Sequence, residues 1–127
     1  MLSHCAVTTM IPVVDLGRAR KFYEHVLRLP APSLHPNGNA IYALTGATVA
    51  LYQRSSPTTA DHTALSFVVN DIHREMESLR EKGVIFEDYD LPGLKTERGV
   101  CVLGSEKAAW FKDTEGNILC IHQDTRA

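Results

Sequence analysis

The sequence predicts an α+β fold built from two copies of one structural unit. In each half, an apolar, β-prone stretch leads to an aspartate, Asp15 or Asp71, that is placed to cap an amphipathic helix. Several short β-prone runs separated by turn residues then follow in both halves. A repeated order of elements indicates an internal duplication, so we expect a single domain over residues 1–127 made of two similar modules.

The first module covers about residues 5–54. Its opening stretch is rich in β-branched residues up to Val14 and predicts a strand, in which Pro12 favours an edge position or the strand end. Apolar residues between 16 and 27 recur at helical spacing on one face. The proline-rich segment 30–39 predicts a loop, and two short strands, at 41–44 and 48–52, form a hairpin through Thr45-Gly46.

The second module covers about residues 62–123 and follows a polar linker at 55–61. It begins with a strand at 62–69 and a helix at 72–82 that ends at Gly83. Further strands are expected at 84–89, 100–103, 108–112 and 118–122. The charged, glycine-bounded segment 90–99 predicts a solvated surface loop, with a lid over a pocket as the alternative.

The composition excludes several classes of function. With 44% hydrophobic and 22% charged residues, the chain has the balance of a globular protein and not of a disordered one. Its net charge of -2 and the lack of a dense Lys/Arg run argue against nucleic-acid binding. No apolar run approaches the roughly 18 residues of a membrane span. The first residues lack the pattern of a secretory signal, so we expect a cytoplasmic protein.

The three cysteines are Cys5, Cys101 and Cys120. They are odd in number, widely spaced and not arranged as C-x-x-C, which favours free thiols over disulfides or a zinc knuckle.

Two motifs resemble the vicinal oxygen chelate superfamily. They are Val14-Asp15-Leu16 with the aromatic and apolar residues of the helix that follows, and the segment 110–119 with the sequence WFKDTEGNIL. That superfamily includes glyoxalase I, bleomycin-resistance and fosfomycin-resistance proteins, and extradiol dioxygenases. The resemblance extends over residues 5–123. It implies two tandem βαβββ modules whose mixed, mainly antiparallel strands curl into a cup with the helices outside, commonly in a homodimer.

The resemblance also implies where a metal would bind. In the metal-dependent members, strands of the two modules supply His, Glu, His and Glu and leave open positions for the substrate. The corresponding residues here are Thr8, Ala50, Ala64 and Cys120, none of which is the usual ligand. We therefore expect no metal or other cofactor. A displaced site of His62, Cys120 and His122 stays open as an alternative, because imidazole and thiolate ligands suit zinc.

Strand alternation predicts which side chains face the cup. We expect the ligand-binding residues to be Thr8, Met10, Tyr52, His62, Ser66, Trp110, Cys120 and His122. Tyr52 and Trp110 could stack on a flat ligand, although Trp110 could equally belong to a core or a dimer interface. Cys120 beside a histidine could be an activated thiolate or an inert buried thiol.

Three functions are compatible with these residues. The leading interpretation is a metal-free homodimer that binds a small organic molecule in an aromatic cavity, as the bleomycin-resistance proteins do. The alternatives are a metal-dependent lyase or dioxygenase with a displaced metal site, and a non-catalytic dimerisation or regulatory domain. Whether the protein is an enzyme is therefore left open, as is the identity of its ligand.

Overall fold

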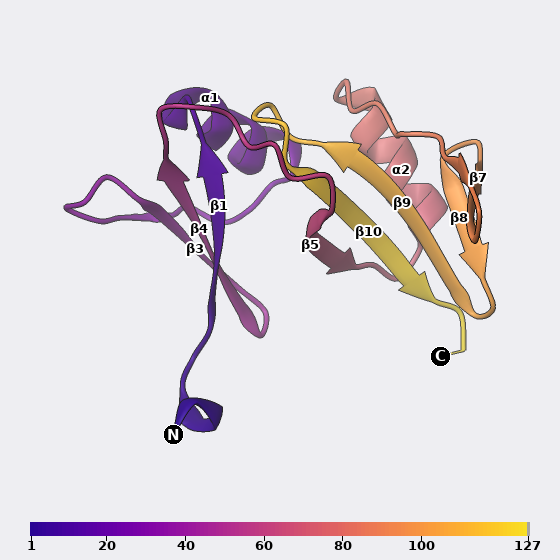
Figure 1. Cartoon of the computed structure of the whole chain (residues 1–127), viewed down its shortest axis with the longest axis horizontal. Helices are drawn as coiled ribbons and strands as arrows, with labels where there is room; N and C mark the ends of the chain where they lie inside the picture. Colours follow the sequence, from indigo (N-terminus) through magenta and orange to yellow (C-terminus); the bar gives the residue numbers. More distant parts are fainter. Residues whose placement is uncertain (127) are drawn as a thin grey trace. The chain divides into compact units, whose positions relative to one another are not determined.

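The computed structural model describes residues 1–126 and divides the chain into two compact units, Met1–Thr59 and Ala60–Ala127 (Figure 1). Each unit consists of a sheet and one main helix, and the mixed strands and two helices confirm the predicted α+β class. Within residues 1–126, no helix is both long enough and apolar enough to cross a bilayer.

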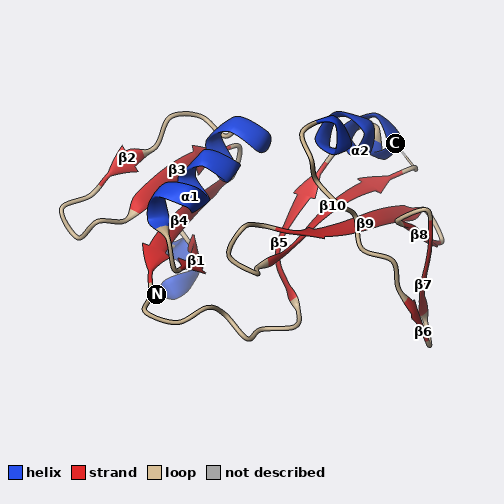
Figure 2. Cartoon of the chain, turned by 90° about the horizontal axis from the view of Figure 1, so that it is seen from above, coloured by secondary structure: helices blue, strands red, loops and turns tan. Residues whose placement is uncertain are grey.

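The first unit has a four-stranded sheet in the order β1-β4-β3-β2. The strands are β1 (Thr8–Val13), β2 (Ser33–Leu34), β3 (Ala40–Leu44) and β4 (Ala47–Gln53). Strand β1 runs parallel to β4, and the other neighbours are antiparallel. A 3-10 turn, η1 (Leu2–His4), precedes β1. Figure 2 shows helix α1 (Leu16–Lys21) lying across this sheet. The predicted hairpin through Thr45-Gly46 is confirmed, whereas the predicted loop at 30–39 contains the short strand β2.

The first helix is shorter in regular α form than its periodicity predicts. Asp15 caps it as expected, accepting a hydrogen bond from the Arg18 backbone N–H at 3.0 Å. From Phe22 to Val26 the chain then continues as a π turn, η2, which contains Glu24. The Glu24 carboxylate accepts hydrogen bonds from Tyr42 of β3 at 2.7 Å and from Arg20 at 2.8 Å. The contact with Tyr42 of the sheet accompanies the wider turn, and helical periodicity alone does not predict that contact.

The second unit has a six-stranded sheet in the order β5-β10-β9-β8-β7-β6. The strands are β5 (Thr63–Val68), β6 (Asp90–Leu91), β7 (Leu94–Glu97), β8 (Val100–Leu103), β9 (Glu106–Lys112) and β10 (Ile118–Asp124). Strand β5 is parallel to β10, and the remaining pairs are antiparallel.

Helix α2 (Ile72–Glu81) packs on β9 and β10 of this sheet. Its buried residues, Ile72, Met76 and Leu79, are spaced to form one apolar face. Asp71 caps the helix by accepting from the Arg74 N–H at 3.2 Å, and Gly83 follows it with a φ of 93°. The predicted helix is thus confirmed, although it ends at Glu81 instead of residue 82.

Two predictions about the following segment are wrong. Residues 84–89 do not form a regular strand and make one isolated bridge, from Phe86 to Phe111. Residues 90–99, expected to be a loop, instead hold the β6–β7 hairpin, which continues the sheet through β8. The Asp88 carboxylate fixes this hairpin by accepting hydrogen bonds from the Thr96 hydroxyl and the Gly99 N–H, both at 2.9 Å. These contacts join residues eight and eleven apart in the sequence. The alternation that predicts strands extends over only a few residues and does not reveal them.

The turn between β9 and β10 explains one of the two sequence motifs. The buried Asp113 carboxylate accepts hydrogen bonds from the backbone N–H groups of Glu115 at 2.8 Å and Asn117 at 2.9 Å. The Asn117 amide also donates to it at 2.8 Å. The D-T-E-G-N sequence therefore sets the turn that aligns β9 with β10.

Candidate functional site

The sequence-predicted site residues fall into two groups, one in each unit. Thr8 and Met10 lie on β1 and Tyr52 on β4 of the first unit. The second unit contains His62, Ser66, Trp110, Cys120 and His122.

In the first unit, the three residues lie on the sheet face that α1 does not cover. The buried Ile11 and Leu51 are register partners on the helix-covered face. Met10, which alternates with Ile11, pairs with Ala50 and is 47% exposed. Tyr52 pairs with Pro12 on the same face and is half-buried. This face offers apolar contacts but no charged group at these positions.

A β-bulge changes the predicted alternation at the start of β5. Regular alternation places His62, Ala64 and Ser66 on one face. In the structure, β10 pairs Ile118 with Thr63 and Leu119 with Leu65, so Ala64 is the extra residue. Thr63 therefore turns toward Trp110, and its hydroxyl accepts a hydrogen bond from the indole Nε1 at 3.1 Å. His62 precedes the strand and is exposed.

Three polar residues meet on the face opposite α2, where β5 and β10 are neighbours. Ser66 is the register partner of Cys120, and its hydroxyl lies 2.6 Å from Nδ1 of His122. This serine–histidine pair can donate and accept hydrogen bonds. The expectation that Ser66, Cys120 and His122 share a face agrees with their positions in the structure.

Cys120 has the environment of an unreactive thiol. Its side chain is buried, with the residue 4% exposed, and its Sγ donates to the carbonyl of Ile121 at 3.4 Å. Burial raises the pKa of Cys120, and hydrogen bonding to Ser66 opposes only part of that effect. The geometry thus favours the buried, protonated form over an activated thiolate.

A hollow of about 320 Å³ lies beside Trp110. It is lined by Asp61, His62, Thr63, Tyr89, Leu91, Leu94, Trp110 and Ile118. The Tyr89 ring meets the Trp110 ring edge to face, with centroids 5.6 Å apart. A hollow of this size with aromatic and aliphatic walls falls in the range of small-molecule sites. Of the predicted residues, it includes His62 and Trp110.

Sequence reasoning missed Thr63 and Tyr89. Thr63 is not among the predicted residues, because regular alternation from His62 and Ser66 would place it on the opposite face. Tyr89 belongs to a segment expected to be a strand, and nothing in its local pattern indicates that the ring turns onto Trp110.

The side chains at the four metal-ligand positions implied by the resemblance do not match the usual donor set. Ala50 and Ala64 have no donor atom, and the buried Cys120 is hydrogen-bonded as a thiol. Across residues 1–126, no three His, Cys, Asp or Glu side chains group closely enough to hold a metal ion. His62, Cys120 and His122 accordingly do not converge on a common centre.

Solved structures of similar fold cover almost the whole chain. A protein assigned to the glyoxalase family from Bacillus anthracis has a TM-score of 0.72 at 14% identity, with 95% of each chain covered. TnmS3, an antibiotic binding protein from a Streptomyces species, has a TM-score of 0.63 at 18% identity, covering 95% of this chain and 98% of its own.

A third similar structure is a mutant of the fosfomycin resistance protein FosX from Listeria monocytogenes in complex with Mn(II) and dihydroxypropylphosphonic acid. Its TM-score is 0.70 at 11% identity, with 100% of this chain and 93% of that chain covered. At these identities, the likenesses show a shared fold.

No curated protein sequence matches the chain significantly. The model of the Glyoxalase/Bleomycin resistance protein/Dioxygenase superfamily, however, matches residues 2–121. Since this match spans nearly all of both units, the chain belongs to the Glyoxalase/Bleomycin resistance protein/Dioxygenase superfamily.

Proposed function

We propose that this protein binds a small, flat organic molecule without a metal ion and holds it against Trp110. The observation that carries the proposal is the hollow beside Trp110, with Tyr89 packed on the indole and Thr63 fixing its orientation. A bound ring would gain dispersion and apolar burial from a surface that is already held in place, which lowers the entropy lost on binding.

The polar groups support a ligand with mixed character. The Trp110 N–H is already used by Thr63, so the indole offers its π face and not a donor. Ser66 and His122, on the same face of the sheet, supply hydrogen-bonding atoms beside this apolar surface. We therefore expect a planar, partly aromatic ligand with a few polar substituents. TnmS3, an antibiotic binding protein of the same fold, is consistent with a small organic ligand.

The proposal also includes the predicted residues of the first unit. Thr8, Met10 and Tyr52 present an uncovered apolar face on the first unit and stay candidates for ligand contact. The homodimer implied by the family resemblance and a cytoplasmic location are likewise part of the proposal. Binding to nucleic acid or to a membrane is not expected.

Tryptophan fluorescence gives a site-specific test, because Trp110 is the only tryptophan of the chain. The probes are Nile red, a neutral planar dye, and metal-free bleomycin. We expect saturable quenching of Trp110 by at least one probe. Glu77→Gln, on the exposed surface of α2, serves as a control that should bind equally well.

Native mass spectrometry of protein purified without chelator completes the test. A dimer free of metal is expected. No quenching by either probe, combined with one retained divalent ion per chain, would overturn the proposal in favour of a metal-dependent lyase or dioxygenase.

A further inference from the structure

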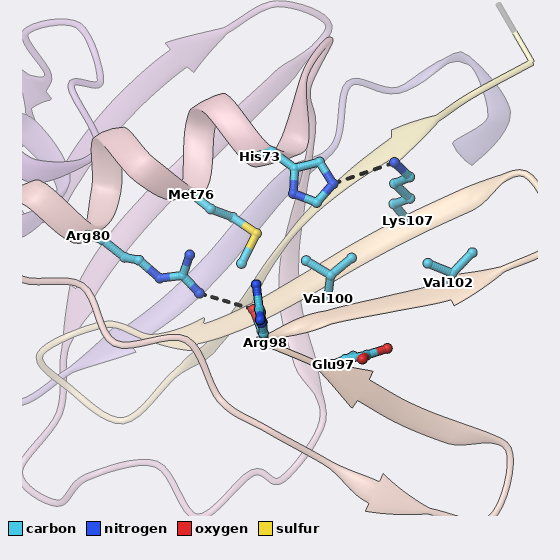
Figure 3. Close-up of a pocket in the computed structure, with 8 residues that line it drawn as sticks. All are labelled: His73, Met76, Arg80, Glu97, Arg98, Val100, Val102 and Lys107. Atoms are coloured by element: carbon cyan, nitrogen blue, oxygen red, sulfur yellow. Dashed lines mark hydrogen bonds between the residues drawn. The ribbon is translucent and has the colours of Figure 1, made fainter.

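A second groove lies on the other face of the same sheet, between α2 and the strands β7, β8 and β9 (Figure 3). Its volume is about 450 Å³. It is lined by His73, Met76, Arg80, Glu97, Arg98, Val100, Val102 and Lys107. Lys107 and Trp110 both belong to β9 but alternate onto opposite faces, so this groove is separate from the hollow beside Trp110.

The groove is positively charged although the chain as a whole carries a net charge of -2. Its lining contains Arg80, Arg98 and Lys107 against the single carboxylate of Glu97. His73 adds a further polar group, with Nε2 lying 3.5 Å from the Lys107 ammonium nitrogen. The lining therefore has an excess of two positive charges with the histidine neutral.

Arg80 has a structural role in this wall. Its guanidinium donates to the Arg98 carbonyl at 3.1 Å and lies 5.2 Å from the centroid of the Phe86 ring. These contacts hold the turn between β7 and β8 against α2. His73 and Lys107 point toward one another along the groove, and Arg98 lies beside Arg80 at its edge, as Figure 3 shows.

Arg98 occupies a backbone conformation that its residue type disfavours. Arg98 and Gly99 form the two-residue turn between β7 and β8, with φ values of 53° and 84°. Such turns prefer Asn-Gly or Gly-Gly, because only small residues enter the left-handed region easily. Packing requires a glycine at position 99, because an added Cβ would lie 3.1 Å from the Phe86 Cβ and 3.2 Å from the Met76 Cε. Arg98 keeps this strained backbone conformation and places a long cationic side chain at the edge of the groove. We take the strain as an indication that the charge of Arg98 has a function.

The geometry points to a binding site for a small organic phosphate. A phosphate dianion matches the two excess positive charges, and its tetrahedral oxygens can accept hydrogen bonds from donors that approach from different elements. Arg98, Lys107 and His73 provide such donors from a turn, a strand and a helix. The organic part would lie on the apolar floor formed by Met76, Val100 and Val102.

The test is a titration of the full chain with phenyl phosphate, followed by backbone amide NMR shifts in 0.15 M salt. Saturable shifts are expected at His73, Arg98 and Lys107. Phenyl phosphate should bind at least fivefold more tightly than inorganic phosphate or benzoate, and phenol should not bind.

Two variants and one control identify the site. Arg98→Asn and Lys107→Gln should each weaken phenyl phosphate binding about five- to tenfold, as expected for one lost charge-assisted hydrogen bond at a partly exposed site. Arg98→Asn should also keep or raise the melting temperature, so unfolding cannot explain its loss of binding. The control is Arg74→Gln, which removes an exposed charge on α2. Arg74 does not line the groove, so this variant should bind phenyl phosphate normally.

Unchanged affinity in Arg98→Asn would overturn the assignment, because the Arg98 side chain would then not contact the phosphate. An equal loss in Arg74→Gln would also overturn it, because binding would then follow overall charge. Equal affinity for inorganic phosphate would remove the apolar floor from the site, and equal affinity for benzoate would refute the preference for phosphate. Either result would also overturn the proposal.

Discussion

Replacing Trp110 tests the proposed site and its supporting contacts together. Trp110→Ala removes an indole that packs edge to face on Tyr89 and donates one hydrogen bond to Thr63. If a planar ligand covers the indole, binding should weaken by about 1 to 3 kcal/mol from lost burial and stacking. That range corresponds to a rise in Kd of roughly 5- to 150-fold. Trp110→Phe keeps an aromatic face and should weaken binding by less than about 1 kcal/mol.

The hydrogen bond between Trp110 and Thr63 should also contribute to folding stability. Trp110→Phe loses the hydrogen bond to Thr63, which is worth about 0.5 to 1.5 kcal/mol. Thr63→Val removes the other partner, so the double variant should lose less than the sum of the two single losses. The assay is urea unfolding followed by far-UV circular dichroism, which does not depend on the tryptophan.

Ligand affinity in these variants is measured by the fluorescence of Nile red itself, because Trp110→Ala has no intrinsic reporter. An unchanged Kd in a folded Trp110→Ala variant would refute the placement of the ligand on the indole. Additive stability losses in the double variant would refute the coupling between Trp110 and Thr63.

Three further predictions concern stability and reactivity. The hydrogen bond from Arg20 lowers the pKa of Glu24, so its stabilising effect is present above the unfolded pKa near 4.5 and is lost as pH falls through the lower folded value. Glu24→Gln should therefore flatten the decline in stability below that pH, measured by chemical unfolding. Burial raises the pKa of Cys120, so iodoacetamide at pH 8 should modify the exposed Cys5 first, as read by peptide mass spectrometry. Arg98→Asn should raise the free energy of unfolding by up to about 1 kcal/mol, because asparagine tolerates the left-handed region better; a clear loss would contradict the strain.

The elements that the sequence predicts well are those fixed by neighbouring residues. Asp15 and Asp71 cap helices whose first N–H groups lie three residues away, and Thr45-Gly46 closes a hairpin between adjacent strands. The β6–β7 hairpin was missed because Asp88 fixes it from outside the segment. The π turn at Glu24 was missed for a related reason, since its partner Tyr42 lies on a strand eighteen residues later.

The same distinction applies to the candidate site. Alternation along a regular strand is enough to place Cys120 and His122 on one face of β10, and the parallel partner strand brings Ser66 beside them. The contact between Trp110 and Thr63 depends on a bulge, whose position is set by pairing between β5 and β10 and not by either strand alone. Residues on regular strands can thus be assigned to a face from sequence, whereas those next to irregularities need the structure.

The alternation of β9 leads to a last prediction that separates the two proposed sites. Lys107 and Trp110 lie three residues apart on one strand but face opposite sides of the sheet, with the buried Ala109 and Phe111 packed on the Lys107 side. Lys107→Gln should therefore weaken phenyl phosphate binding and leave Nile red affinity unchanged, and Trp110→Ala should do the reverse. Each probe, titrated against both variants, provides the control for the other. If either variant weakened both probes in a folded protein, the probes would share one site, and the assignment of separate ligands to the two faces would be wrong.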